Sequence, residues 1–370
     1  MRFKFLACGA MPLAFGVSLA IPTMVVAVPA LSAVSAADGF VLPAPKVGRH
    51  RPLIAILADN GGAQTTDFIV PYGVLKDSDV ADVRSVSTRT GTITLTRGLR
   101  ITADETIAAF DAREAAGADI VIVPAQADPR NAVVAGWLRT QAAKGATIIS
   151  VCDGARVLAN AGLLDGRRAV THWASFQGMA KSYPTTNWIK DRRYLQDGPI
   201  ISTAGVTASI PMSLALVDAI GGHAAAIATA HRFGVEDWGS AHRTADFSIE
   251  KSDIAVAMLA RKAAHESVEI PIEDGIDEVS LALQAEAWGR SGRSKVAATH
   301  TGGRPVRSRH GLIIMADGEA QAGSYIIQPT TLPAVPQFEA TLAEMERRYG
   351  VGAGRLVKVA MEYDTPLRAD

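Results

Sequence analysis

Residues 149–164 read ISVCDGARVLANAGLL, an apolar run that meets a cysteine, an acid and a glycine and then continues with helical spacing. The run ATIISV (146–151) predicts a strand buried on both faces, and the leucines that follow Gly154 predict a helix. A strand that turns at once into a helix exposes the intervening side chain at the top of a sheet, in the geometry of a nucleophile elbow. Cys152 is therefore the first candidate nucleophile.

Similar apolar runs occur earlier in the chain, at 52–58 (PLIAILA) and 119–123 (DIVIV). Helical patterns separate them, at 65–75, 103–110 and 131–144. Alternating strands and helices predict right-handed crossovers and an α/β sandwich with a mostly parallel sheet. Sites in such sheets form at the carboxyl ends of strands, which is where Cys152 falls.

The composition suits a folded protein of one or two domains, with 370 residues, of which 48% are hydrophobic and 20% charged. Lys and Arg together number 37, as do Asp and Glu, so no net field favours nucleic acid or anionic lipid. The histidines lack metal-site spacing, and the glycine-rich stretches lack the lysine of a phosphate loop. We therefore expect no metal, no cofactor and no nucleic-acid partner.

The first 36 residues begin with Arg2 and Lys4, continue as an apolar run and end in small residues, as a signal peptide does. An uncleaved membrane anchor is the alternative, since the run is long. The pattern predicts export to the periplasm, followed by a linker over 37–51. Cleavage near Ala36 removes Cys8 and leaves Cys152 as the only cysteine, so no intramolecular disulfide can form.

The sequence contains a short internal echo, because RGLRITAD (97–104) resembles HGLIIMAD (310–317). A Thr-Gly pair precedes each block, and the strand at 54–57 can be matched with residues 254–259. We interpret 250–370 as a partial second copy that has no nucleophile. Coincidence in two generic strand-turn-strand units is the alternative, and under either interpretation the region is a structural appendage.

Four motifs occur in order: VCDGARVLA (151–159), AGLLDGRR (161–168), THW (171–173) and TAGV (203–206). Together they resemble the DJ-1/PfpI superfamily and, within it, the branch shared by isonitrile hydratase and the amidase-like domain of AraC-type transcription regulators. The resemblance covers residues 52–235. It implies the flavodoxin-like three-layer sandwich of class I glutamine amidotransferases, here followed by a smaller α/β partial repeat.

The resemblance also implies three catalytic residues: Cys152 as the nucleophile, His172 of the THW motif, and Asp67, the acid that points at the thiol in relatives. A protonated acid can stabilise a thiolate and an ionised one can accept its proton, while an imidazole can shuttle protons. Each residue also has a structural alternative. Cys152 can fill space as a small hydrophobe, Asp67 can cap a helix, and His172 can pack in the core.

Two departures from the family pattern stand near the elbow. Asp153 occupies a position where hydratase-like relatives often have threonine, and its charge would raise the pKa of the thiol. It either caps the elbow helix or acts as a general base for water. Ala125 and Gln126 replace glycines whose N–H groups complete an oxyanion hole, although both can still donate a backbone N–H, and Gly154 permits the tight turn.

These observations predict an exported protein in which Cys152 adds to a small electrophilic carbon and water completes a hydration or hydrolysis. The alternative is a non-enzymatic module that binds a small ligand or senses oxidation through Cys152. Many relatives pair as dimers, and the appended copy could cover that surface within one chain. We therefore expect a monomer or a loose homodimer.

Overall fold

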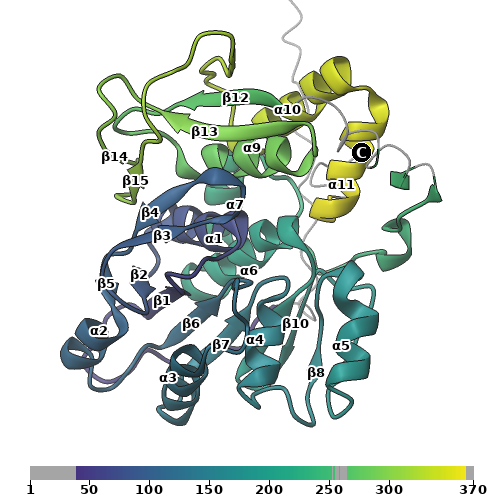
Figure 1. Ribbon diagram of the computed structural model, residues 1–370. Helices are drawn as coiled ribbons and strands as arrows, with labels where there is room; N and C mark the ends of the chain where they lie inside the picture. The colour runs from purple at the N-terminus through teal and green to yellow at the C-terminus, as the bar shows by residue number, and fades with distance from the viewer. Residues whose placement is uncertain (1–38, 252, 255–257, 259–264, 364–370) are drawn as a thin grey trace, which may run out of the picture. The chain divides into compact units, whose positions relative to one another are not determined.

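The computed structural model describes residues 39–251, 253–254, 258 and 265–363 (Figure 1). The expected signal peptide or anchor at 1–36 lies outside these residues. None of the helices in the described part of the chain is long and apolar enough to cross a bilayer.

A seven-stranded sheet forms the centre of the fold, in the order β10-β11-β7-β6-β1-β2-β5. Every neighbouring pair is parallel except β10 and β11, which are antiparallel. Strands covered on both faces are expected to be almost wholly apolar, and every residue of β1 is buried. The strands are β1 (Leu53–Ala58), β2 (Asp82–Ser87), β5 (Glu105–Thr106), β6 (Ile120–Val123), β7 (Thr147–Ser150), β10 (Tyr194–Asp197) and β11 (Ile200–Thr203).

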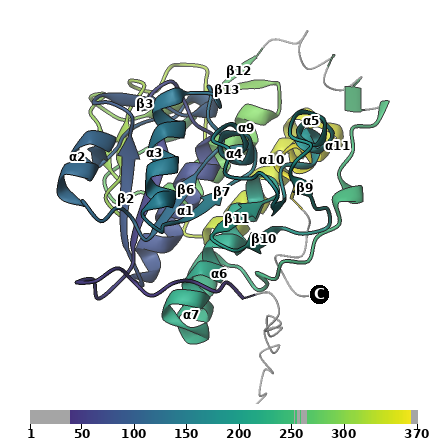
Figure 2. The ribbon, with the colours of Figure 1, turned by 90° about the horizontal axis from the view of Figure 1, so that it is seen from below.

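Two hydrophobic cores lie on opposite faces of this sheet, because successive side chains of a strand point in opposite directions. Ile54 and Ile56 belong to one core, and Leu53 and Leu57 belong to the other. The two sets of helices lie on either side of the strands (Figure 2). The first core is covered by α1 (Thr65–Ser78), α6 (Ser209–Gly221) and α7 (His223–Phe233), and the second by α2 (Ile107–Arg113), α3 (Ala132–Ala143) and α4 (Gly154–Asn160). The predicted three-layer sandwich is confirmed.

The C-terminal region adds a smaller α/β unit beside α1 (Figure 1). One sheet is three-stranded and parallel, with the order β13-β12-β16. A second sheet is four-stranded, with the order β14-β15-β4-β3. The second sheet joins the C-terminal hairpin of β14 and β15 to the hairpin of β3 and β4 from the first half of the chain. Its elements are β12 (Glu266–Pro271), α9 (Glu278–Arg290), β13 (Ser294–Thr299), β14 (Val306–Arg307), β15 (Ile313–Met315), β16 (Tyr325–Ile326), α10 (Ala334–Tyr349) and α11 (Val351–Met361).

The remaining elements are short and connect the larger ones. They are β3 (Thr92–Thr94), β4 (Arg100–Thr102), β8 (Arg168–Ala169), α5 (Phe176–Ser182), β9 (Asn187–Trp188) and the 3₁₀ turns η1 (Thr96–Gly98), η2 (Trp173–Ser175), η3 (Val206–Ala208) and η4 (Thr244–Asp246).

One detail of the predicted repeat is wrong. Ile254, matched above with a strand, is helical, and part of 254–259 lies outside the described residues. In the C-terminal region the counterpart of β1 is β12, because it too lies between two parallel neighbours. Its sequence, ESVEIP, carries two glutamates, and this is why an apolar pattern did not find it.

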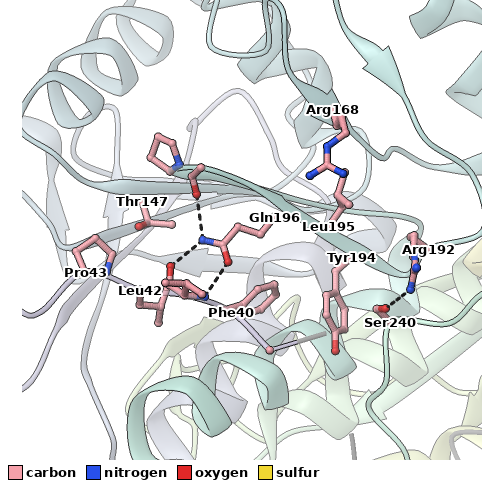
Figure 3. A pocket seen from close by; sticks show the side chains of 14 residues that line it. Phe40, Leu42, Pro43, Thr147, Arg168, Arg192, Tyr194, Leu195, Gln196 and Ser240 are labelled. Atoms are coloured by element: carbon pink, nitrogen blue, oxygen red, sulfur yellow. Dashed lines mark hydrogen bonds between the residues drawn. The ribbon is translucent and has the colours of Figure 1, made fainter. Parts of the chain in front are cut away.

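Residues 39–51, which we expected to form a linker, lie against the sandwich. Phe40 is buried and its ring packs 5.0 Å from that of Tyr194. The Gln196 side chain exchanges two 2.8 Å hydrogen bonds with the backbone of Val41, in the region drawn in Figure 3. Arg49 donates to Asp119 at 2.8 Å. This segment is therefore part of the folded domain.

Candidate active site

Cys152 stands between the end of β7 and the start of α4 with a positive φ of 56°. For a residue with a side chain this left-handed backbone costs about 1–3 kcal/mol and is found preferentially at functional sites. The Cys152 N–H donates to Thr203 Oγ1 at 3.2 Å, which ties the turn to the end of β11. The sequence-predicted elbow is therefore present, with its nucleophile in a strained conformation.

Gly154 allows the elbow to lie close to the neighbouring strand. A Cβ atom at this position would stand 2.1 Å from the carbonyl oxygen of Val123, at the end of β6. Backbone cannot yield as a flexible side chain can, so any larger residue would push α4 away from the sheet. Gly154 thus fixes the position of the turn that carries Cys152.

Asp67 lies in the first turn of α1 and is wholly buried. The residue that precedes the helix is Gln64, so Asp67 is not its N-cap residue. Its Oδ2 accepts a hydrogen bond from the Ala125 N–H at 3.2 Å, while Oδ1 has no partner among the described residues. A buried oxygen without a partner is costly, and it can bond the thiol or a small molecule at the site.

Burial raises the pKa of both Asp67 and Cys152 well above their usual values. The charges of Asp67 and Asp153 raise the pKa of the thiol further, whereas the charge of Arg290 and the backbone N–H of Asp153 lower it. Protonation of Asp67 removes its share of the repulsion, since the two groups titrate together. Burial therefore favours the neutral forms of both groups, a carboxylic acid beside a thiol.

His172 lies on the segment before η2, and both of its ring nitrogens are engaged. Nδ1 accepts from the Ala174 N–H at 3.2 Å, so Nε2 carries the proton and donates to the carbonyl oxygen of Ala360 at 3.2 Å. Ala360 belongs to α11. The ring thus holds the C-terminal helix, an arrangement that the structural alternative describes better than a proton shuttle does.

The interpretation of Asp153 as a helix cap is wrong. It precedes α4, but its side chain makes no hydrogen bond to the helix N–H groups. Its two carboxylate oxygens accept from Thr171 Oγ1 at 3.3 Å and Ser175 Oγ at 2.7 Å. Asp153 therefore ties the elbow to the segment that contains His172.

One of the two backbone N–H groups expected to complete an oxyanion hole is engaged elsewhere. The N–H of Ala125 is used by Asp67, as described above. The Gln126 side chain donates to Leu57 and Pro124 carbonyl oxygens and accepts from the Asp59 N–H. The Ala125 N–H therefore positions the acid, and Gln126 fastens the loop to β1.

Three charged residues were not predicted: Glu286 and Arg290 of α9, whose charges act on Asp67, and Arg97 of η1, which lies beside Glu286. Glu286 is wholly buried, and its Oε1 accepts from Arg290 Nε at 2.5 Å and lies 3.7 Å from Arg97 Nε. The signal in the sequence is an acid and a base four residues apart on a helix whose other residues are mostly apolar. That spacing is common on exposed helices, so only burial reveals its role.

Access to the sulfur is narrow, because Cys152 is only 6% exposed. A cavity of about 860 Å³ lies near the other end of the sheet, next to Thr147 at the start of β7 (Figure 3). Phe40, Tyr194 and Gln196 line it. It therefore cannot bring a ligand to Cys152, which follows the opposite end of the same strand. Within the described residues, no group of three His, Cys, Asp or Glu side chains is placed to hold a metal ion.

Comparison with known proteins agrees with the motifs. The sequence model of the DJ-1/PfpI family matches residues 53–219. Isonitrile hydratase of Pseudomonas putida is 32% identical over 165 residues, which cover 43% of this chain and 68% of that protein. The HTH-type transcriptional regulator CdhR of Pseudomonas aeruginosa is 37% identical over 118 residues, 31% of this chain but only 35% of the regulator.

Among solved structures, Drosophila melanogaster DJ-1beta is similar to 49% of this chain over 96% of its own length, with 20% identity and a TM-score of 0.44. The family rests on the sequence matches, which agree with the resemblance inferred from the elbow and the motifs that follow it. The chain belongs to the DJ-1/PfpI family.

Proposed function

We propose that the protein catalyses the addition of water to a small electrophilic substrate through a covalent adduct on Cys152. The observation that carries the proposal is the strained φ of 56° at Cys152 next to the buried, unpartnered Oδ1 of Asp67. Strain and an unsatisfied polar atom both cost stability, and such costs are typical of catalytic sites.

The proposed chemistry starts from a neutral thiol and a protonated Asp67, the forms that burial favours. As Sγ forms a bond to the electrophilic carbon, protonated Asp67 gives its proton to the substrate, and the resulting carboxylate takes the proton of the thiol. Water then adds to the same carbon, the carbon–sulfur bond breaks, and the sulfur recovers a proton through Asp67. The sum is one water added to one substrate.

The narrow access supports a small substrate, since Cys152 is only 6% exposed. The similarity to isonitrile hydratase makes an isonitrile the first compound to test. Asp153 stands where a threonine often follows the nucleophile, so we propose the reaction class and not this one substrate.

The test is turnover of a panel of small isonitriles, nitriles and aldehydes, followed by NMR. Hydration of an isonitrile yields the N-substituted formamide. We expect at least one compound to turn over with the native protein and not with Cys152→Ser or Cys152→Ala. A matched control is Ser150→Ala, in β7 beside the elbow, which should retain turnover. Equal turnover by the native protein and Cys152→Ala would refute the proposal.

A sensor of oxidation or of a ligand is the second candidate. It is favoured by the similarity to a transcriptional regulator. The raised pKa of the buried thiol slows oxidation as well as nucleophilic attack, so it does not separate the two candidates. This candidate predicts no turnover of any compound but a stable gain of oxygen at Cys152 after mild peroxide treatment, read by mass spectrometry.

We also propose export, from the pattern of residues 1–36. Expression of the full chain in a bacterial host with a periplasm should yield a mature protein that starts near Ala37. N-terminal sequencing of the periplasmic fraction tests this; an intact Met1 in a membrane pellet would support the anchor.

A further inference from the structure

The elements of the C-terminal region recur in the order of those at the start of the sandwich. The offset is a constant 213 residues, as from Leu53 to Glu266. It relates β1 to β12, α1 to α9 and β4 to β15 at their first residues. The pairing recurs too, since β1 lies between β2 and β6 and β12 lies between β13 and β16.

The two sets meet about a local two-fold axis. In the antiparallel pair of β4 and β15, Ile101 lies opposite Ile314, its own counterpart at the same offset. On either side, Arg100 lies opposite Met315 and Thr102 opposite Ile313. Helix α1 likewise packs against its counterpart α9. Counterparts that face one another are the signature of an isologous interface, formed here within one chain.

Among its described residues, the C-terminal set has no elbow. It runs from β12 to α10, the counterparts of β1 and α3, and no strand and turn equivalent to β7 and Cys152 follow in the part of the chain that the structure describes. The position equivalent to Asp67 is Ser280. The axis therefore relates one site with a nucleophile to one without.

Across the axis, α9 brings charges to the nucleophile that α1 does not carry. The position of Glu286 corresponds to Gly73, and that of Arg290 to Asp77. Glu286 Oε2 accepts from Thr96 Oγ1 at 3.5 Å, and the same hydroxyl accepts from the Thr65 N–H at 3.1 Å, at the start of the helix that carries Asp67. The pair thus lies beside the start of the helix that carries Asp67, and both charges act on that acid.

Arg290 is held by several partners. Its side chain is 15% exposed, its Nε donates to Glu286, and its Nη1 donates to the Ala360 carbonyl oxygen at 3.1 Å, the oxygen that also receives His172 Nε2. Its charge acts on both Cys152 and Asp67. A guanidinium so confined has little freedom to turn.

We propose that Arg290, supplied by the second set of elements, is a positioning residue of the Cys152 site that holds the negative charge developing at Sγ, with Glu286 opposing it. The proposal rests on the proposed role of Cys152 as a nucleophile. The charges that act on the sulfur are those of Asp67, Asp153 and Arg290, and Arg290 is the one that favours the thiolate. Glu286 acts on Asp67 and pairs with Arg290, and Arg97 lies beyond Glu286.

The test is the pH dependence of Cys152 alkylation by iodoacetamide in the full chain, with Cys152→Ser as the blank for Cys8. Arg290→Gln should raise the thiol pKa. At pH values below the thiol pKa, alkylation should slow by about tenfold for each unit by which the pKa rises. Glu286→Gln should lower the thiol pKa and speed alkylation. Arg290→Lys should stay close to the native protein. Arg309→Gln is the matched control, because Arg309 pairs with Asp277 at the other end of α9.

Shifts of the thiol pKa in opposite directions in Arg290→Gln and Glu286→Gln support the proposal. If Arg290 and Glu286 had only a structural role, both substitutions would move the thiol pKa in one direction or not at all. Shifts of the same sign in two folded variants, or no shift, would overturn it. If Arg290→Gln does not fold, Glu286→Gln decides alone, and a thiol pKa that is unchanged or raised overturns the proposal. No substrate is needed, so failure to find turnover counts against the proposed function and not against this inference.

Discussion

Arg290 and His172 donate to the same carbonyl oxygen, that of Ala360, at 3.1 and 3.2 Å. One residue comes from the C-terminal set of elements and the other from the sandwich, so α11 is bonded to both. The appended region is thus bonded, through α11, to the segment of the sandwich that carries His172.

Replacing His172 separates the structural role of the ring from a catalytic one. We expect His172→Ala to lower the free energy of unfolding by about 1–2 kcal/mol, because two hydrogen bonds are lost. The thiol pKa should not change, since neither ring nitrogen bonds the sulfur. Urea unfolding and alkylation against pH measure the two effects. His231→Ala, exposed on α7, is the control, and a large change in the thiol pKa would restore the proton shuttle.

Two glycines test the close approach at the elbow. Gly154→Ala should destabilise the protein by about 1–3 kcal/mol or more, because the new Cβ meets a backbone oxygen. Gly136→Ala in α3 adds the same methyl group with nothing within 4 Å and should stabilise the helix by up to about 1 kcal/mol. Thermal unfolding of both variants gives the comparison, and equal effects would mean that α4 can move freely.

Asp153→Asn tests the charge beside the thiol. The amide oxygen can still accept from Ser175, but the negative charge is gone, so the thiol pKa should fall and alkylation near neutral pH should speed up by as much as about tenfold. Asp165→Asn is the control, since Asp165 also accepts from a hydroxyl, that of Thr185, but on an exposed loop. An unchanged or slower rate in Asp153→Asn would contradict the assigned charge effect.

Asp67→Asn should stabilise the protein and abolish its activity. Burial raises the pKa of Asp67 in the folded state, so its contribution to stability is full below about pH 4 and is lost as pH rises through the folded pKa. The Asp67→Asn variant has no carboxyl to titrate, so it does not lose this stability as pH rises. Its free energy of unfolding should therefore exceed that of the native protein by an amount that grows from about pH 4 to about pH 8. Turnover should drop at least about a hundredfold.

Asp77→Asn gives the reverse pH trend and so serves as the contrast. Burial raises the pKa of Asp77, but hydrogen bonds with His310 and Arg232 together lower it. The contribution of Asp77 to the free energy of unfolding is present above its pKa in the unfolded chain and is lost as pH falls through its pKa in the folded protein. Asp77→Asn should therefore lower the free energy of unfolding most at neutral pH. Urea unfolding across pH checks both variants, and parallel pH profiles would contradict the assigned directions.

The sequence predicted the fold well, because buried parallel strands are continuous apolar runs and the elbow combines a strand, a cysteine and a glycine in one short stretch. It did not predict Arg290 or Glu286, since their contact with the site depends on how two distant halves of the chain pack. It also matched the wrong segment with β1. The true counterpart, β12, carries Glu266 and Glu269, which bond Arg348 and Ser324.

The roles of polar residues near the elbow were equally hard to predict. The position of Asp153 before a helix favours a cap, yet Thr171 and Ser175 take both carboxylate oxygens. The loop at 124–127 could donate backbone N–H groups anywhere, and only the fold directs that of Ala125 to Asp67. Hydrogen-bond partners far apart in the sequence leave no local pattern.

The most direct test of the central claim is mass spectrometry of the protein after rapid acid quench during turnover of a substrate from the panel. The account predicts a covalent substrate adduct on the Cys152 peptide that forms and decays at the rate of turnover, and that is absent from Cys152→Ala. Turnover without any adduct, undiminished in Cys152→Ala, would contradict it.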